Sequence, residues 1–201
     1  MESIPCDIVL LPSDELAQKL ITVSGTLAAQ SPLFTLDGVS FYPHASLYMT
    51  QLKVADLDKA KGLLRSIADN TAAIDLVSWK YDQTMGFLDA EYQRTEQLDG
   101  LQQAVIAAIN PIRDGMRQKD RTRMLEATGV ARENLERYGY QPVGELFRPH
   151  ATITRFADNA TTDIALLPAP AHFSGQFTHI GLFEMGDNGT CIREIARYSL
   201  G

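Results

Sequence analysis

Two short stretches of the sequence carry the same pattern of residue types. "PHASL" (43–47) and "PHATI" (149–153) each contain Pro, His, Ala, a hydroxyl residue and an aliphatic residue. Alternate side chains of an extended strand share a face. His44 and Ser46 are therefore expected to point the same way, as are His150 and Thr152, with imidazole and hydroxyl about 7 Å apart along each strand.

Four such groups around one small volume suit phosphodiester chemistry without a metal. One neutral imidazole accepts a proton from the nucleophile while the other, protonated, donates one to the departing oxygen. Histidine fits both roles because its ordinary pKa of about 6.5 makes both protonation states accessible near neutral pH. The two hydroxyls can donate hydrogen bonds to the non-bridging phosphate oxygens. We therefore predict His44 and His150 as catalytic residues, Ser46 and Thr152 as phosphate ligands, and no metal or other cofactor.

The paired pattern resembles the 2H phosphoesterase superfamily, which includes bacterial RNA 2′,3′-cyclic phosphodiesterases, also called 2′-5′ RNA ligases. The similarity is strongest in "RPHATITRF" (148–156); at the first motif Ser46 replaces the more common Thr. The resemblance implies an α+β, bilobal, pseudo-twofold fold with two antiparallel sheets and flanking helices around a central cleft. Residues 1–201 would form this single domain.

The resemblance also implies a cyclic phosphodiesterase acting on 2′,3′-cyclic phosphates or related small cyclic or 2′-5′ phosphodiesters of nucleotides or RNA ends. Which histidine is the acid and which the base stays open. Two alternatives remain: a nucleotide or RNA-end binding module without turnover, and an RNA 2′-5′ ligase on the same scaffold.

Three further residues are candidates for substrate binding. Strand alternation places Tyr48 on the face of His44. Trp79 is a candidate for stacking on a base, although aromatic residues of hairpins more often pack across strands. Arg155 follows the second histidine by five residues, which places it on the opposite face of the strand from His150.

The remaining histidines and a basic segment are expected to be structural. His172 and His179 lack the full pattern, and no carboxylate or thiol completes a metal site around them at ligand spacing. The segment "RDGMRQKDRTR" (113–123) has five basic residues and two acidic ones. It is expected to form a solvated helix end or loop, with RNA backbone binding as the alternative.

The elements that position the motifs follow from hydrophobic periodicity and turn residues. Two strands are expected around "YDQT" (81–84), and a long helical region follows, divided at Pro111 and Gly115. Hairpins are mixed with helices, which favours α+β over a doubly wound parallel sheet. Further strands are expected at 8–11, 41–52, 172–184 and 190–199. Helices are expected at 13–30 and 55–70, and a hairpin turn at 186–189.

Composition limits the partners. The 201 residues carry a formal net charge of −7, which disfavours long duplex DNA and favours a small nucleotide or RNA-end substrate. No apolar stretch approaches a membrane span and the N-terminal residues do not resemble a signal peptide. The two cysteines, Cys6 and Cys191, are expected to be reduced and buried. We therefore expect a cytoplasmic monomer.

Overall fold

The structure, a computed structural model, describes residues 2–201; Met1, with which the expected domain begins, lies outside the described residues. Five α-helices and nine strands are found in this range. The helices are α1 (Asp14–Thr26), α2 (Leu57–Ala68), α3 (Glu96–Ile109), α4 (Gln118–Met124) and α5 (Gly129–Tyr138). The strands are β1 (Ser3–Pro12), β2 (Phe34–Thr35), β3 (Ala45–Lys53), β4 (Ile74–Leu76), β5 (Ser78–Thr84), β6 (Phe87–Tyr92), β7 (His150–Arg155), β8 (Gly175–Met185) and β9 (Cys191–Ser199).

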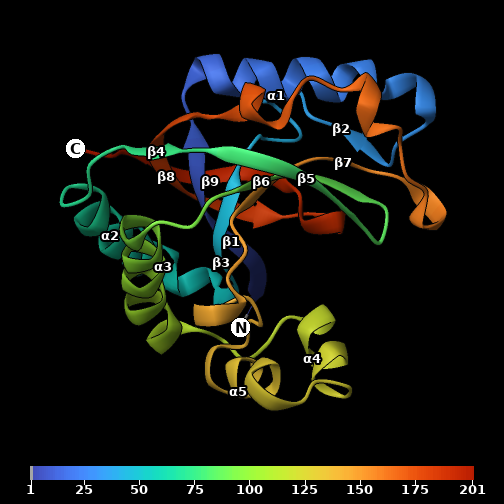
Figure 1. The fold of residues 1–201 in the computed structure, drawn as a ribbon. Coiled ribbons are helices and arrows are strands. Elements are labelled where there is room, and N and C mark those ends of the chain that lie inside the picture. The colour runs from blue at the N-terminus through green and yellow to red at the C-terminus, as the bar shows by residue number, and fades with distance from the viewer. Residues whose placement is uncertain (1) are drawn as a thin grey trace.

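All strand pairs are antiparallel, and they form one nine-stranded sheet in the order β4-β8-β1-β3-β7-β6-β5. In addition, β2 pairs with β7, and β9 with β8. The α+β prediction is confirmed, but two separate sheets are not found. The reason is a direct junction between the two histidine strands, where Ala45 of β3 pairs with Ala151 of β7. At this pair the two halves of the chain meet in one sheet (Figure 1).

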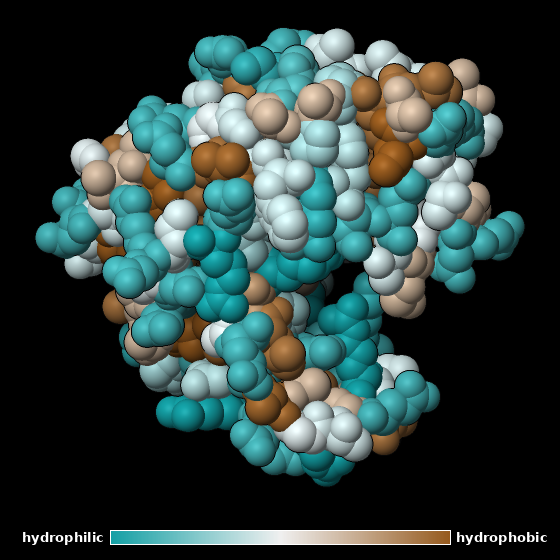
Figure 2. All heavy atoms as spheres, viewed as in Figure 1, coloured by the Kyte–Doolittle hydropathy of each residue, from teal (hydrophilic) through white to brown (hydrophobic). Residues whose placement is uncertain are grey.

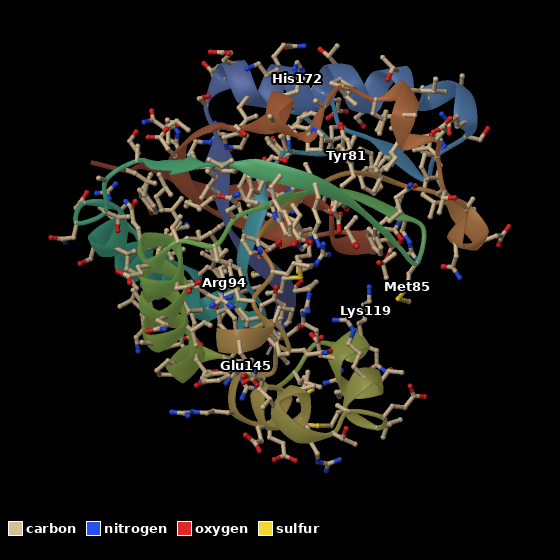
Figure 3. All side chains as sticks on the ribbon, viewed as in Figure 1. Tyr81, Met85, Arg94, Lys119, Glu145 and His172 are labelled. Atoms are coloured by element: carbon tan, nitrogen blue, oxygen red, sulfur yellow. The ribbon has the colours of Figure 1, made fainter. Side chains whose placement is uncertain are left out.

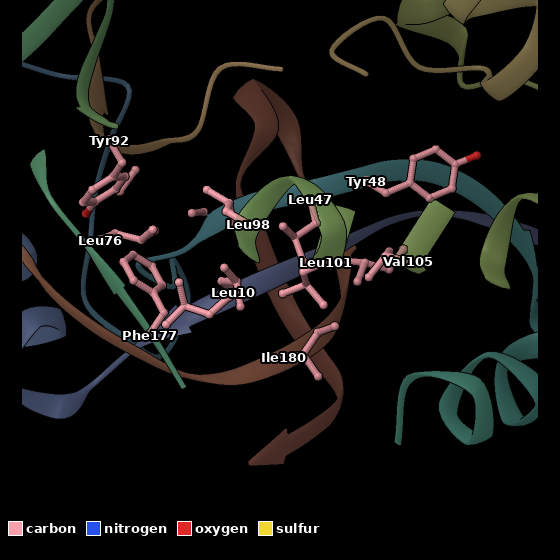
Figure 4. Packing of buried hydrophobic residues seen from close by; sticks show 14 of the residues in the cluster. Leu10, Leu47, Tyr48, Leu76, Tyr92, Leu98, Leu101, Val105, Phe177 and Ile180 are labelled. Atoms are coloured by element: carbon pink, nitrogen blue, oxygen red, sulfur yellow. The ribbon is translucent and has the colours of Figure 1, made fainter. Parts of the chain in front are cut away.

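The main core lies on one face of the sheet. On β1 the alternation sends Cys6, Ile8 and Leu10 into it, where they pack with residues of α1, α2 and α3. Figure 4 shows part of this packing, with Leu10 and Leu47 from the strands near Leu101 of α3. The other residues of β1, including Asp7 and Val9, therefore point to the opposite face, which carries the histidine motifs.

Both histidine strands contain a β-bulge directly after the hydroxyl residue. Val9 and Ile8 of β1 pair with Ser46 and Tyr48 of β3, so Leu47 is the extra residue. Asp89 and Leu88 of β6 pair in the same way with Thr152 and Thr154 of β7, leaving Ile153 extra. A bulge shifts the alternation of side chains by one residue beyond it, and both predicted strands lacked this shift.

The hairpin of β5 and β6 turns later than predicted. Residues 81–84 belong to β5, and the turn consists of Met85 and Gly86, which have φ angles of 55° and 81°. Two successive positive φ angles match the twist of a two-residue hairpin turn. Gly86 is required here for another reason, since a Cβ would lie 2.4 Å from the Phe156 carbonyl oxygen.

The predicted long helical region is divided as expected. A short 3₁₀ helix containing Pro111 follows α3, and Gly115 adopts a positive φ of 71° before α4. Figure 1 shows α4 and α5 together at one side of the sheet, away from α1. Residues 2–201 contain no helix that is long and apolar enough to cross a membrane.

Candidate active site

A cleft of about 700 Å³ lies between the sheet and α4. Both histidines and both motif hydroxyls line it, and the other wall carries basic residues of the segment around α4. Figure 2 shows the molecule hollowed at this place, with hydrophilic residues around the opening. The predicted central cleft therefore exists, but the two histidine strands lie side by side in one of its walls.

In the first histidine unit, the ring is fixed by its own backbone. Nδ1 of His44 is 2.7 Å from the Tyr42 carbonyl oxygen. A carbonyl only accepts, so Nδ1 carries a proton and Nε2 has a free lone pair in the neutral ring. Ser46 donates to Oδ2 of Asp7 at 2.6 Å, and the same oxygen is 3.8 Å from Nε2 of His44.

The second unit repeats this arrangement. Nδ1 of His150 is 2.7 Å from the Arg148 carbonyl oxygen, and Nε2 is 3.8 Å from Oδ2 of Asp89. Thr152 donates to Oδ1 of Asp89 at 2.7 Å. Each unit therefore contains an oriented imidazole, a hydroxyl and an aspartate from the neighbouring strand.

The junction of β3 and β7 brings the two units together. Because Ala45 pairs with Ala151 in antiparallel register, His44 is aligned with Thr152, and Ser46 with His150. His44 and Thr152 also line one small hollow beside the cleft. Each imidazole therefore lies next to the hydroxyl of the other motif.

The two aspartates differ in their surroundings. Asp7 is fully buried, and burial raises the pKa of Asp7 to about 7, against the opposing effects of the Ser46 hydrogen bond and of Arg117. Its Oδ1 atom has no hydrogen-bond partner within residues 2–201. Asp89 instead pairs with Arg148, whose Nη2 lies 2.8 Å from Oδ2.

The two histidines also differ in burial, and the more buried one belongs to the unit of the buried aspartate. Burial lowers the pKa of His44, with the positive charge of His150 acting in the same direction and a hydrogen bond to the Tyr42 backbone opposing it. His44 is 9% exposed, whereas the side chain of His150 is 28% exposed. Near neutral pH the burial of His44 therefore favours its neutral form.

Within residues 2–201, one group of three side chains is arranged so that it could hold a metal ion. Potential ligand atoms of Asp7, His44 and Cys191 lie within 4.8 Å of one another, and all three residues are buried. This is the ligand chemistry of zinc, and it shares His44 with the two-histidine site. Burial raises the pKa of the Cys191 thiol, and the nearby Asp7 raises it further, so the thiol is not prepared as a thiolate ligand.

None of the three predicted substrate-binding residues is among those that line the cleft, and two of them lie away from it. Tyr48 is fully buried, and its hydroxyl donates to Asn110 and to the Tyr138 carbonyl. Its expected direction is wrong because the bulge at Leu47 turns it into the core and brings Met49 to the cleft instead. Trp79 is 52% exposed and lies under the ammonium of Lys80, outside the cleft.

Arg155 and the basic segment lie closer to the site than predicted. The bulge at Ile153 returns Arg155 to the face of His150, and its guanidinium bonds to Asn188, a cleft residue. Arg117 is 7% exposed rather than solvated because Asp120, fully buried, accepts its hydrogen bond at 2.6 Å. Lys119 projects at the opening (Figure 3).

The roles of Asp7 and Asp89 in the site were not predicted from the sequence. Asp7 interrupts the apolar run "CDIVLL" (6–11), and a lone charge in an otherwise apolar strand is a signal for a buried polar role. Asp89 in "GFLDAEY" (86–92) gives a weaker signal of the same kind. Their partners Ser46 and Thr152 are 39 and 63 residues away, so the pairing depends on the sheet.

His172 and His179 are outside the cleft, and both cysteines are buried and unpaired, as predicted.

Comparisons with known proteins place the chain in a family. A family described as a protein of unknown function (DUF1045) matches residues 49–180. The chain therefore belongs to this family, and the match includes the second motif but begins after the first. A comparison with curated proteins gave no match.

Solved structures share the fold over the whole chain. Escherichia coli LigT in its apo form is 15% identical, with a TM-score of 0.59 and coverage of 100% of this chain and 99% of LigT. LigT complexed with 3′-AMP is 14% identical with a TM-score of 0.58 and the same coverage. TT0787 of Thermus thermophilus is 15% identical, with a TM-score of 0.57 and 98% of each chain covered. The resemblance to 2H phosphoesterases is confirmed for the fold.

Proposed function

We propose that this protein is a metal-independent phosphoesterase that hydrolyses 2′,3′-cyclic phosphates or related small cyclic or 2′-5′ phosphodiesters of nucleotides or RNA ends. The observation that supports this most is the duplicated unit of imidazole, hydroxyl and aspartate, with both copies in one cleft. Two oriented imidazoles with free Nε2 atoms supply a base and an acid for a displacement at phosphorus. LigT complexed with 3′-AMP shows that a protein of this fold binds a small nucleotide.

The surroundings of the imidazoles suggest their roles. Neutral His44 takes a proton from water through Nε2 as the water oxygen bonds to phosphorus. The bond from phosphorus to the 2′- or 3′-oxygen breaks, and protonated His150 gives its proton to that oxygen. The carboxylate of Asp89, fixed by Arg148, supports the positive charge of His150. The products are a phosphomonoester and a free hydroxyl, so charge and atoms balance.

The two hydroxyls approach the phosphate differently. Ser46 now donates to Asp7. When Asp7 is protonated, which its raised pKa of about 7 favours below neutral pH, it donates this bond instead, and the Ser46 proton becomes free for a phosphate oxygen. Thr152 donates to an aspartate paired with Arg148, so its proton reaches the phosphate only after that bond breaks.

The test is turnover of 2′,3′-cyclic AMP by the purified protein in the presence of EDTA, with separation of the 2′- and 3′-monophosphates. The wild type is expected to be active, and a His44→Ala/His150→Ala double variant inactive. His172→Ala is the matched control, because His172 is exposed and contacts Phe173 edge to face, away from the cleft. Binding of the cyclic nucleotide without turnover would favour the binding-module alternative. Loss of activity in EDTA with recovery on zinc would favour the Asp7, His44 and Cys191 group as a metal centre.

A ligase is distinguished in the same assay. Addition of an RNA fragment with a 5′-hydroxyl tests whether this hydroxyl replaces water as the nucleophile. A joined product in excess over hydrolysis would overturn the hydrolase assignment.

A further inference from the structure

The bulge at Ile153 gives the second histidine strand a cation that the first lacks. Arg155 and Met49 occupy corresponding positions, each three residues after the motif hydroxyl and beyond the bulge. The guanidinium of Arg155 lies 4.5 Å from the centroid of the Phe87 ring. It donates to the Asn188 side chain at 2.6 Å and to the Met85 carbonyl at 3.2 Å. Arg155 is therefore held in a fixed place beside the cleft.

A second cation approaches the same aromatic ring from the other wall. The ammonium of Lys119, from α4, is 5.9 Å from the Phe87 centroid. Figure 3 shows Lys119 and Met85 facing each other across the opening. Burial lowers the pKa of Lys119, and the charges of Arg123, Arg155 and Arg117 lower it further. Positive charges thus gather at one end of the cleft in a protein of net charge −7.

Three arginines of the cleft pair with carboxylates, whereas the guanidinium of Arg121 bonds to the Gln118 side chain instead. Asp120 pairs with Arg117 and Arg123, and Arg148 pairs with three carboxylates of β5 and β6. Within residues 2–201, neither Lys119 nor Arg155 forms an ion pair with a carboxylate. Two cations that share one aromatic ring and have no carboxylate partner repel each other, and an anion bound between them would relieve this repulsion.

The cations are close to the histidine pair yet separate from it. Asn188, which fixes Arg155, is followed by Gly189, whose backbone contacts the imidazole of His44. An anion between Lys119 and Arg155 would therefore lie near a phosphate held by the histidines, but at a separate place. Met49 occupies the corresponding place on the first strand, so within residues 2–201 that strand supplies no matching cation there.

We propose that Lys119 and Arg155 bind a second phosphate group of the substrate. The substrate class is then a small cyclic phosphodiester, such as a nucleoside cyclic phosphate, that also carries a phosphomonoester. This inference rests on the proposed function, because it adds a second group to the substrate assigned there. A doubly charged terminal phosphate fits two cations better than a singly charged phosphodiester of an RNA chain does.

Calorimetric binding of 3′-AMP and of adenosine 3′,5′-bisphosphate tests the second phosphate directly. Both probes carry the 3′-phosphate, and only the bisphosphate carries the second. We expect the wild type to bind the bisphosphate at least about tenfold more tightly, which corresponds to about 1.4 kcal/mol. Lys119→Met and Arg155→Met should each reduce this ratio to below about threefold. Lys59→Met, at an exposed position of α2 remote from the cleft, is the control and should retain the ratio.

Thermal unfolding of each variant shows whether it is folded, and the ratio of two affinities in one preparation cancels differences in active fraction. Equal affinity of the wild type for the two probes would overturn the second-phosphate site. A preference for the bisphosphate that both Lys119→Met and Arg155→Met retain would also overturn this site.

Turnover separates this proposal from the proposed function. If 2′,3′-cyclic AMP is hydrolysed but a 5′-phosphate on it gives no gain in kcat/KM and no gain in affinity, the function stands and the second site fails. If neither cyclic nucleotide is hydrolysed while the bisphosphate preference persists, the phosphoesterase fails and the two-phosphate binding site stands.

Discussion

The two histidine units share a backbone plan but have different electrostatic surroundings. Both have a histidine held by a carbonyl two residues earlier, a hydroxyl, a bulge and an aspartate from the flanking strand. In the first unit the aspartate is buried, with Oδ1 unpaired; in the second it is paired with Arg148. Repetition of the backbone thus supplies two similar imidazoles, and the unequal carboxylates give them different tasks.

The largest expected effect comes from removing either imidazole. His44→Ala and His150→Ala should each lower kcat for 2′,3′-cyclic AMP by about 10²- to 10⁴-fold, because each removes one proton-transfer group. Steady-state kinetics and circular dichroism of both variants check this. A loss in only one variant would break the equivalence of the two units and leave a single catalytic histidine.

The aspartates should separate the two units more sharply. Asp89→Asn removes a negative charge beside His150 and leaves Arg148 with one fewer partner, and we expect kcat/KM to fall roughly tenfold, the effect of about 1.4 kcal/mol. Asp7→Asn replaces a carboxyl that is largely neutral at pH 6 by a neutral amide, so the loss there should be under about threefold. Measurement at pH 6 of both variants decides this. A larger loss for Asp7→Asn than for Asp89→Asn would reverse the assignment.

Asp7 should also make stability depend on pH. Between about pH 4 and 7 the unfolded chain has lost the Asp7 proton while the folded protein, with a pKa of about 7, retains it. The folded state then binds more protons, so the contribution of Asp7 to the free energy of unfolding falls as pH rises, by on the order of a few kcal/mol. Asp7→Asn lacks this term. Its stability relative to the wild type should therefore increase from pH 4.5 to 7.5 in urea unfolding, and a constant difference would show that Asp7 is ionised in the fold.

The smallest effect on activity is expected at Tyr48. Tyr48→Phe removes a buried hydroxyl that bonds to Asn110 and to the Tyr138 carbonyl. It should cost about 1–3 kcal/mol of stability and change kcat/KM by less than about twofold. Activity assays beside thermal unfolding separate the two effects. A large rise in KM with unchanged stability would mean that Tyr48 contacts substrate after all.

The order of elements and the site motifs were readable from sequence because they depend on local patterns. The alternation of side chains correctly placed His44 and Ser46 on one face of their strand, and His150 and Thr152 on one face of theirs. These residues precede the bulges. The same rule failed at Tyr48 and Arg155, which follow the bulges. A bulge is set by pairing with a strand that is distant in sequence, so the residues around it carry no local sign of it.

Long-range features were missed for a related reason. The junction that joins the expected two sheets is one pair of alanines 106 positions apart in the register of β3 and β7. Arg117 is buried by its bond to Asp120, which a charge count over 113–123 did not reveal. That residues 1–201 act as one bilobal domain, in a cytoplasmic monomer, stays a prediction.

The pH dependence of kcat/KM for 2′,3′-cyclic AMP tests the central claim most directly, because it reports the acid and base of the free enzyme. With His44 as the base and its pKa lowered by burial, we predict a bell-shaped profile whose acidic limb has its midpoint below pH 6.5. The residual activity of His44→Ala should lack this limb. A rate that is independent of pH between 5 and 8, or an acidic limb that persists in His44→Ala, would contradict catalysis by the histidine pair.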